Sequence, residues 1–213
     1  MIITYEGAEF IKIQQGDTVV AFNPVSKDSK LKSSNFGADI ALITANHHDL
    51  NGVETVTRGE KEPFVINGPG EYEVEGLFIK GYSTKTNYGG TERINTIFST
   101  KIDNINVVFL GAMSDTDFSA DVKEDLDDVD ILFVPIGGEG VLDASEAYKL
   151  AVKREPKVII PIHFGSVGSK DALKDFLKEG GSEDVKPVEK LTVKMKDIEK
   201  SEGDIIVLKS NNN

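Results

Sequence analysis

The sequence predicts a β-rich sandwich flanked by helices, in the α/β (α+β) class. Three observations support this. Short strand-like runs separated by turn residues fill the first half of the chain, and helices alternate with apolar strands in the second half. Two apolar runs, 40–43 and 158–162, also end in polar segments that carry the three histidines. The length suits one large domain or two small ones, and we expect a single domain over residues 1–213.

The first half is predicted to be mainly β. Alternating apolar residues between turn signals such as Gly16-Asp17, Glu75-Gly76 and Asp103-Asn104 indicate short antiparallel strands and hairpins. Residues 83–93 are polar and contain glycine, so we expect there a loop that could reach over an active-site edge. The predicted strands are 2–5, 9–14, 18–22, 38–44, 64–67, 72–74, 77–82, 94–102 and 105–110.

The second half alternates helix with strand. Asp143 followed by Glu146 is typical of a capping box, and Pro156 ends the helix that begins there. Ser169 is expected to cap another helix, which Gly180-Gly181 terminates. A short acidic helix is predicted over 118–126. The predicted strands are 129–135, 158–162, 191–195 and 204–208.

Composition excludes several classes of function. The formal net charge of −12 disfavours attraction to nucleic acid or to an anionic membrane. No apolar run approaches the roughly 18 residues that a membrane span needs, and the first residues resemble no signal peptide, so we expect a cytoplasmic protein. There is no cysteine, so zinc or iron would need His, Asp or Glu ligands.

The candidate metal ligands lie at the two strand ends. His47, His48 and Asp49 follow the strand that ends near Thr44, and His163 follows the strand over 158–162. An α/β scaffold brings such distant loops together at one edge of its sheets. Asp49 has a purely structural interpretation as well, because an aspartate just after a strand can cap a helix beginning near Asn51.

Several segments together resemble the metallo-β-lactamase fold superfamily, in particular its branch of ascorbate-phosphate lactonases and small predicted metal-dependent hydrolases. The resemblance covers most of the chain and implies a four-layer αβ/βα sandwich with a two-metal site at one edge. The segments that carry it are 44–50 (TANHHDL), 67–74 (NGPGEYEV), 109–111 (FLG), 130–138 (DILFVPIGG) and 161–165 (PIHFG).

The ligand set that this resemblance implies is incomplete here. His47, Asp49 and His163 match ligand positions of the family. At the other four the family has histidine or aspartate, whereas this chain has Ala45, Leu50, a residue near Lys85, and Ala112. A catalytic zinc normally needs about three protein ligands and an open position for water, which neither half of the implied site supplies. A lysine near the third position would also repel a dication.

Three functions remain open at this point. The main hypothesis is a non-catalytic protein with a degenerate metal site and no cofactor, which binds a small ligand or a protein partner. The alternative is a hydrolase of an ester, lactone or phosphate bond. It would use one zinc or manganese held by His47, Asp49 and His163, with His48 as a substitute ligand if it turns inward and Asp49 as the catalytic residue. A third possibility is a structural subunit of a homo-oligomer.

Overall fold

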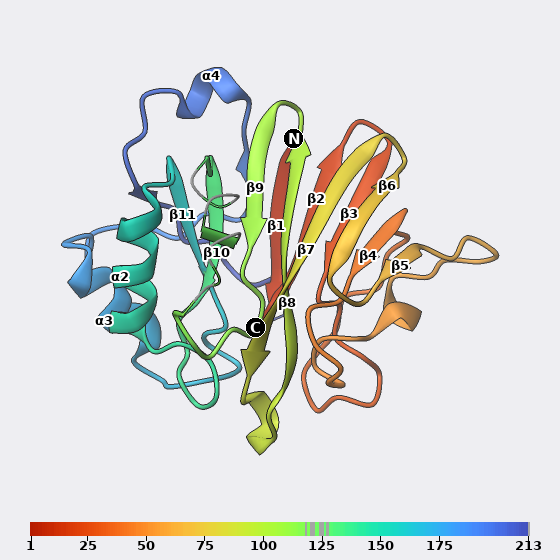
Figure 1. Cartoon of the computed structure of the whole chain (residues 1–213), viewed down its shortest axis with the longest axis horizontal. Helices are drawn as coiled ribbons and strands as arrows, with labels where there is room; N and C mark the ends of the chain where they lie inside the picture. The colour runs from red at the N-terminus through yellow and green to blue at the C-terminus, as the bar shows by residue number, and fades with distance from the viewer. Residues whose placement is uncertain (118, 120–121, 124–125, 127, 213) are drawn as a thin grey trace.

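Two mixed β-sheets face each other in this structure (Figure 1). The computed structural model describes residues 1–117, 119, 122–123, 126 and 128–212. In spatial order, the first sheet contains β12 (Leu191–Thr192), β1 (Ile2–Gly7), β2 (Phe10–Gln15), β3 (Thr18–Phe22), β4 (Ile40–Leu42) and β5 (Phe64–Ile66). The second contains β13 (Asp204–Ile205), β11 (Val158–Ile162), β10 (Ile131–Pro135), β9 (Ile105–Phe109), β8 (Arg93–Ile102), β7 (Leu77–Thr86) and β6 (Gly70–Val74).

The main core fills the space between the two sheets. Strand residues alternate between faces, so every second side chain of β1, β2 and β3 points toward the second sheet. The ring of Phe109 lies between Phe22 of the first sheet and Phe133 of its own, at centroid distances of 4.8 and 5.7 Å. These buried apolar contacts hold the sheets face to face.

Helices cover the outer face of the second sheet. α2 (Ala144–Arg154) and α3 (Ala172–Glu179) lie beside β10 and β11 on the left of the view, and Ala147, Leu150 and Phe176 pack onto this face (Figure 1). On the first sheet the outer layer is slighter. Its apolar residues Phe10, Ala21, Val25, Ala38, Ala41 and Val56 form a small cluster, next to the 3₁₀ turn η1 (Val53–Thr55). The predicted α+β sandwich class is confirmed.

Two predicted hairpin turns show why these strands pair as they do. Asp103 and Asn104 between β8 and β9 have φ values of 54° and 62°, and Glu75 and Gly76 between β6 and β7 have 52° and 75°. Two consecutive positive φ values define the turn whose twist matches that of the flanking strands. Both turns had been predicted from these dipeptides.

The predicted loop over 83–93 is wrong at its two ends. β7 continues to Thr86 and β8 begins at Arg93, so only the tip of the hairpin, with the short turn η2 (Tyr88–Gly90), is irregular. Thr84 and Thr86 are β-branched residues at alternating positions, and Thr86 is 1% exposed. The polar composition concealed a half-buried strand, because threonine suits a strand despite its polarity.

Three boundaries in the C-terminal part differ from prediction. α3 begins at Ala172 with Asp171 at its cap position. The Ser169 N–H instead donates to the Gly137 carbonyl at 2.8 Å, which ties Ser169 to a neighbouring loop. The predicted strand over 191–195 ends at Thr192, and α4 (Met195–Ile198) follows. β13 ends at Ile205, short of the predicted Leu208. The helix predicted over 118–126 falls partly outside the described residues.

No helix in the described part of the chain combines the length and apolarity needed to cross a bilayer.

The loops after β4 and β11 and the tip of the β7–β8 hairpin form what we call the motif edge, made of residues 44–50, 87–92 and His163. The hairpin tip projects at the bottom of the view in Figure 1.

The capping box of α2 gives a test of the fold. The Glu146 N–H donates to Asp143 Oδ1 at 2.8 Å, and the Asp143 N–H donates to Glu146 Oε2 at 3.1 Å. Replacing Asp143 by alanine should lower the free energy of unfolding by about 1 kcal/mol in urea denaturation. Asp171→Ala is the matched control, because Asp171 occupies the same position on α3 without a side-chain cap bond. Equal losses in both variants would contradict the capping assignment.

Candidate functional site

Three of the predicted site residues form one group. A nitrogen from each of His47 and His48 and a carboxylate oxygen of Asp49 lie within 4.8 Å of one another, and within the described ranges this is the cluster able to hold an ion. The rings of His47 and His48 are tilted by 31° with their centroids 4.1 Å apart. His48 is exposed, His47 is half-buried and Asp49 is buried. The structure therefore places His48 beside Asp49, at 3.4 Å from Nε2 to Oδ1.

His47 is held as a neutral ring. Its Nδ1 accepts a hydrogen bond from the backbone N–H of Asp49 at 3.2 Å, so this nitrogen carries no proton, and its 3.5 Å approach to Asp49 Oδ2 is not an ion pair. Burial lowers the pKa of His47 below its usual value and outweighs the charge of Asp49, which raises it.

Asp49 does not cap a helix. One carboxylate oxygen, Oδ1, accepts from the Ser29 hydroxyl, and the other, Oδ2, accepts from the Tyr88 hydroxyl at 2.7 Å. The segment after it forms only the 3₁₀ turn η1, whose cap residue is Gly52. The prediction that Asp49 caps a helix near Asn51 is wrong, because hydroxyl donors from distant segments bind both of its oxygens.

His163 is not part of the group around Asp49. It is 1% exposed, and its Nδ1 lies 2.6 Å from Oε1 of the fully buried Glu9. Glu9 in turn accepts from the Asn23 amide at 2.8 Å. In metal-binding histidines, a carboxylate at Nδ1 orients Nε2 toward the ion. His163 has such a carboxylate at Nδ1, and its Nε2 has no hydrogen-bond partner in the described part of the chain. Its backbone has a φ of 60°, which is uncommon for a non-glycine residue.

Tyr88 explains why these residues do not converge. Its ring centroid lies 4.8 Å from the His47 ring and 4.8 Å from the His163 ring, so the phenol stands between the two histidines. Burial, and then the bond to Asp49, raise the pKa of Tyr88 far above its ordinary value, so the hydroxyl stays protonated as a donor. Gly89 permits this approach, because a Cβ there would lie 2.7 Å from His47 Nε2.

The substituted ligand positions pack against the same tyrosine. Ala45, Leu50 and Ala112, each where the resemblance implies a ligand, form one buried apolar cluster with Val141, and Tyr88 packs on it. Alanine and leucine side chains cannot bind a metal, so these three positions offer no donors to the metal pair that the resemblance implies. A single ion has suitable nitrogen and oxygen donors only at His47, His48 and Asp49 among the described residues.

Lys85 does not act as expected. Its side chain is exposed, with Nζ 3.2 Å from Glu92 Oε1 across the hairpin, so the lysine pairs with a carboxylate at the surface. Sequence reasoning also missed Glu9, Asn23, Ser29 and Tyr88. The polar composition of residues 83–93 predicts a segment that reaches over this edge. The tip of the hairpin does so through Tyr88, which contacts His47 and Asp49.

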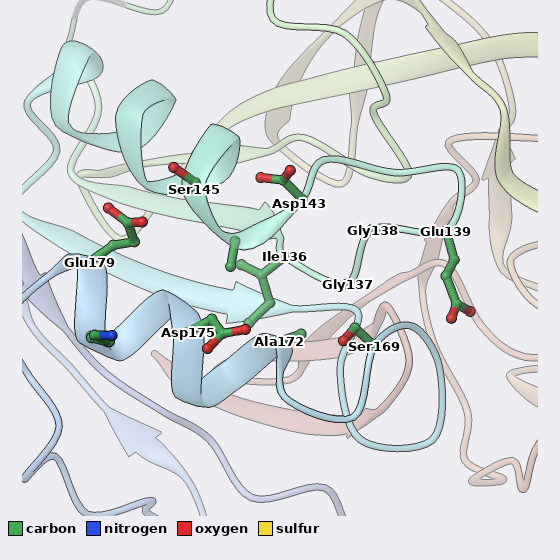
Figure 2. A pocket seen from close by; sticks show the side chains of 12 residues that line it. Ile136, Gly137, Gly138, Glu139, Asp143, Ser145, Ser169, Ala172, Asp175 and Glu179 are labelled. Carbon is green, nitrogen blue, oxygen red and sulfur yellow. The ribbon is translucent and has the colours of Figure 1, made fainter.

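A separate hollow of about 580 Å³ lies between the first turns of α2, the α3 helix and the loop after β10 (Figure 2). Asp143, Asp175, Glu179 and Glu139 contribute carboxylates to its lining, with Lys178 as the basic residue there. Figure 2 shows Glu139 on the loop, away from the carboxylates of the two helices. The hollow is thus predominantly acidic.

Comparison with known proteins identifies the family. A family model described as the β-lactamase superfamily domain matches residues 2–163, which is most of the chain. The chain belongs to the β-lactamase superfamily. The superfamily predicted from the sequence is therefore confirmed, as is the fold.

Relatives of this chain carry hydrolase names. A metal-dependent hydrolase of Natranaerobius thermophilus is 24% identical over 187 residues, covering 78% of this chain and 84% of the relative. A metal-dependent hydrolase of Bacillus subtilis is 22% identical over 197 residues, covering 78% of this chain and 86% of that one.

Solved structures share this fold. A candidate Zn-dependent hydrolase of the metallo-β-lactamase superfamily from Thermotoga maritima is 25% identical, with a TM-score of 0.75 and 97% of each chain covered. A metallo hydrolase from Ignicoccus hospitalis, at 17% identity, has a TM-score of 0.63 and covers 91% of this chain and 99% of its own. The second likeness concerns the fold alone.

The pKa of His47 offers a direct check of this geometry. In a pH titration followed by NMR, the His47 imidazole should titrate below the usual value of about 6.5, because burial disfavours its charged form. In Asp49→Asn the midpoint should fall further, because the carboxylate raises the pKa. A midpoint that rises in Asp49→Asn would contradict the arrangement.

Proposed function

We propose that this chain is a non-catalytic member of the superfamily that binds a small ligand at the motif edge. The observation that carries the proposal is the position of Tyr88 between His47 and His163, with its hydroxyl bound to Asp49. A metal ion and a phenol ring cannot share that volume. The apolar cluster of Ala45, Leu50 and Ala112 around the ring supports the same proposal.

A second candidate is the hydrolase of an ester, lactone or phosphate bond. It is favoured by the names of the relatives and by the group of His47, His48 and Asp49. These residues would hold one zinc or manganese, and the ion would supply a polarised water. Asp49 would orient that water or take its proton, but both of its oxygens already accept hydroxyl hydrogen bonds.

Metal content distinguishes the two candidates. Protein purified without chelator and then incubated with zinc or manganese should contain clearly less than one ion per chain if the first proposal holds. In Tyr88→Ala the ring is gone, and zinc affinity should rise roughly tenfold or more because the volume between His47, Asp49 and His163 opens. Tyr148→Ala is the matched control, since it removes a partly buried tyrosine from α2. A stoichiometric ion in the unaltered protein would contradict the first proposal.

His48→Ala tests the second candidate. The side chain is exposed, so its removal should leave the free energy of unfolding within about 0.5 kcal/mol of the original value. If the hydrolase candidate holds, this variant loses both bound metal and hydrolysis of a nitrophenyl ester. Under the first proposal neither quantity differs from that of the unaltered protein, because neither metal nor hydrolysis is present to lose.

A further inference from the structure

A cavity of about 450 Å³ opens beside the motif edge, and nothing so far assigns it a role. Its walls come from the loop after β4, the turn between β5 and β6, and the beginning of β8. The lining residues are Thr44, Ala45, Asn46, Asn67, Gly68, Pro69, Arg93, Ile94 and Thr96. No acidic side chain belongs to this lining, in contrast to the hollow between α2 and α3.

Arg93 gives the cavity a positive charge. Its Nη1 donates to the carbonyls of Tyr88 and Thr91 at 2.8 and 3.0 Å, which fixes the guanidinium at the base of the hairpin tip. Across the described ranges, no carboxylate lies within 4.0 Å of it. The two backbone bonds use only Nη1, so among the described residues the Nε and Nη2 edge is left without a partner, and this edge matches the two oxygens of a carboxylate or phosphate.

Thr96 supplies a second polar group. Its side chain is fully buried, and its Oγ1 has no hydrogen-bond partner in the part of the chain that the structure describes. A buried hydroxyl without a partner costs free energy, so such a group is expected to have one when the protein is functional. The amides of Asn46 and Asn67 belong to the same lining and offer further donors.

The remaining walls are apolar. Ile94 is 62% exposed, an unusual extent for isoleucine, and with Ala45 and Pro69 it forms an apolar portion of the lining. The cavity therefore combines a charged donor, polar donors and an apolar surface. This is the composition of sites that bind small organic molecules, in which a few polar groups fix the orientation.

We propose that this cavity binds a small organic anion, whose carboxylate or phosphate head contacts Arg93 and reaches the buried Thr96 hydroxyl by displacing the atoms that cover it, while its apolar body lies against Ile94 and Pro69. The proposal deepens the function proposed above and rests on it, because it names the ligand class of the motif edge. The acidic hollow between α2 and α3 is unsuited to such a ligand, since its carboxylates would repel the head group.

Isothermal titration of the full chain with benzoate, phenyl phosphate and the neutral analogue benzamide tests the proposal. Benzoate or phenyl phosphate should bind with one site per chain, and the tighter of the two identifies the head group. Benzamide should bind roughly tenfold more weakly or not measurably, because it lacks the charge that a guanidinium recognises. Absence of binding by both anions would overturn the proposal.

Two variants place the site. Arg93→Met should weaken anion binding roughly tenfold or more, while Arg58→Ala, which removes the same charge from an exposed position outside the lining, should leave it unchanged. Thr96→Val keeps the shape of the side chain and removes the hydroxyl. It should weaken binding several-fold without lowering the melting temperature, because the hydroxyl has no partner in the protein itself.

The outcomes separate this proposal from the one it rests on. Equal anion binding in Arg93→Met and the unaltered protein would overturn the cavity assignment, whatever the metal content. Thr96→Val with lower stability and unchanged binding would assign Thr96 a structural role and contradict its part in the site. Anion binding that depends on Arg93 in a protein with a stoichiometric metal would support the cavity and contradict the metal-free function.

Discussion

The hydrogen bond from the Tyr88 hydroxyl to Asp49 determines what the motif edge can do. A buried carboxylate needs either a cation or several hydrogen-bond donors to offset its loss of hydration. Here Ser29 and Tyr88 supply the donors, one to each oxygen. The same bond fixes the phenol ring between His47 and His163, so the charge of Asp49 is stabilised and the histidines are kept apart by one side chain.

The hydrogen bonds behind this edge tie His163 to the loops after β3 and β4. Glu9, in the turn just before β2, binds both His163 and Asn23, and the Asn23 amide also donates to the Thr44 hydroxyl at 2.8 Å. This chain of contacts links β2 and the ends of β3, β4 and β11. Removing one member would leave other buried polar groups without hydrogen-bond partners. The free-energy cost of such unpaired groups exceeds what the lost hydrogen bond contributes to stability. The Nδ1 side of His163 is therefore fixed by this network, whereas its Nε2 has no hydrogen-bond partner in the described part of the chain.

Much of the fold could be predicted because its signals are local. Alternating apolar residues, the two-residue turns at Asp103 and Glu75, and the capping box at Asp143 each act within a few positions.

The site could be predicted only in part. His47, His48 and Asp49 are neighbours in sequence, and the structure keeps them together. Tyr88, Glu9 and Ser29 meet them only through folding, so no spacing in the sequence indicates those contacts. The hairpin was misassigned because its threonines were counted as polar.

The motif edge carries an apolar cluster and a neutral phenol, and the chain as a whole carries a net charge of −12. Binding of the proposed anion beside this edge therefore requires a cation close by, positioned by the same structural elements. Arg93 meets this requirement, because its guanidinium is held by the carbonyl of Tyr88 itself. The hairpin that places the phenol against Asp49 thus also presents the positive charge to the neighbouring cavity.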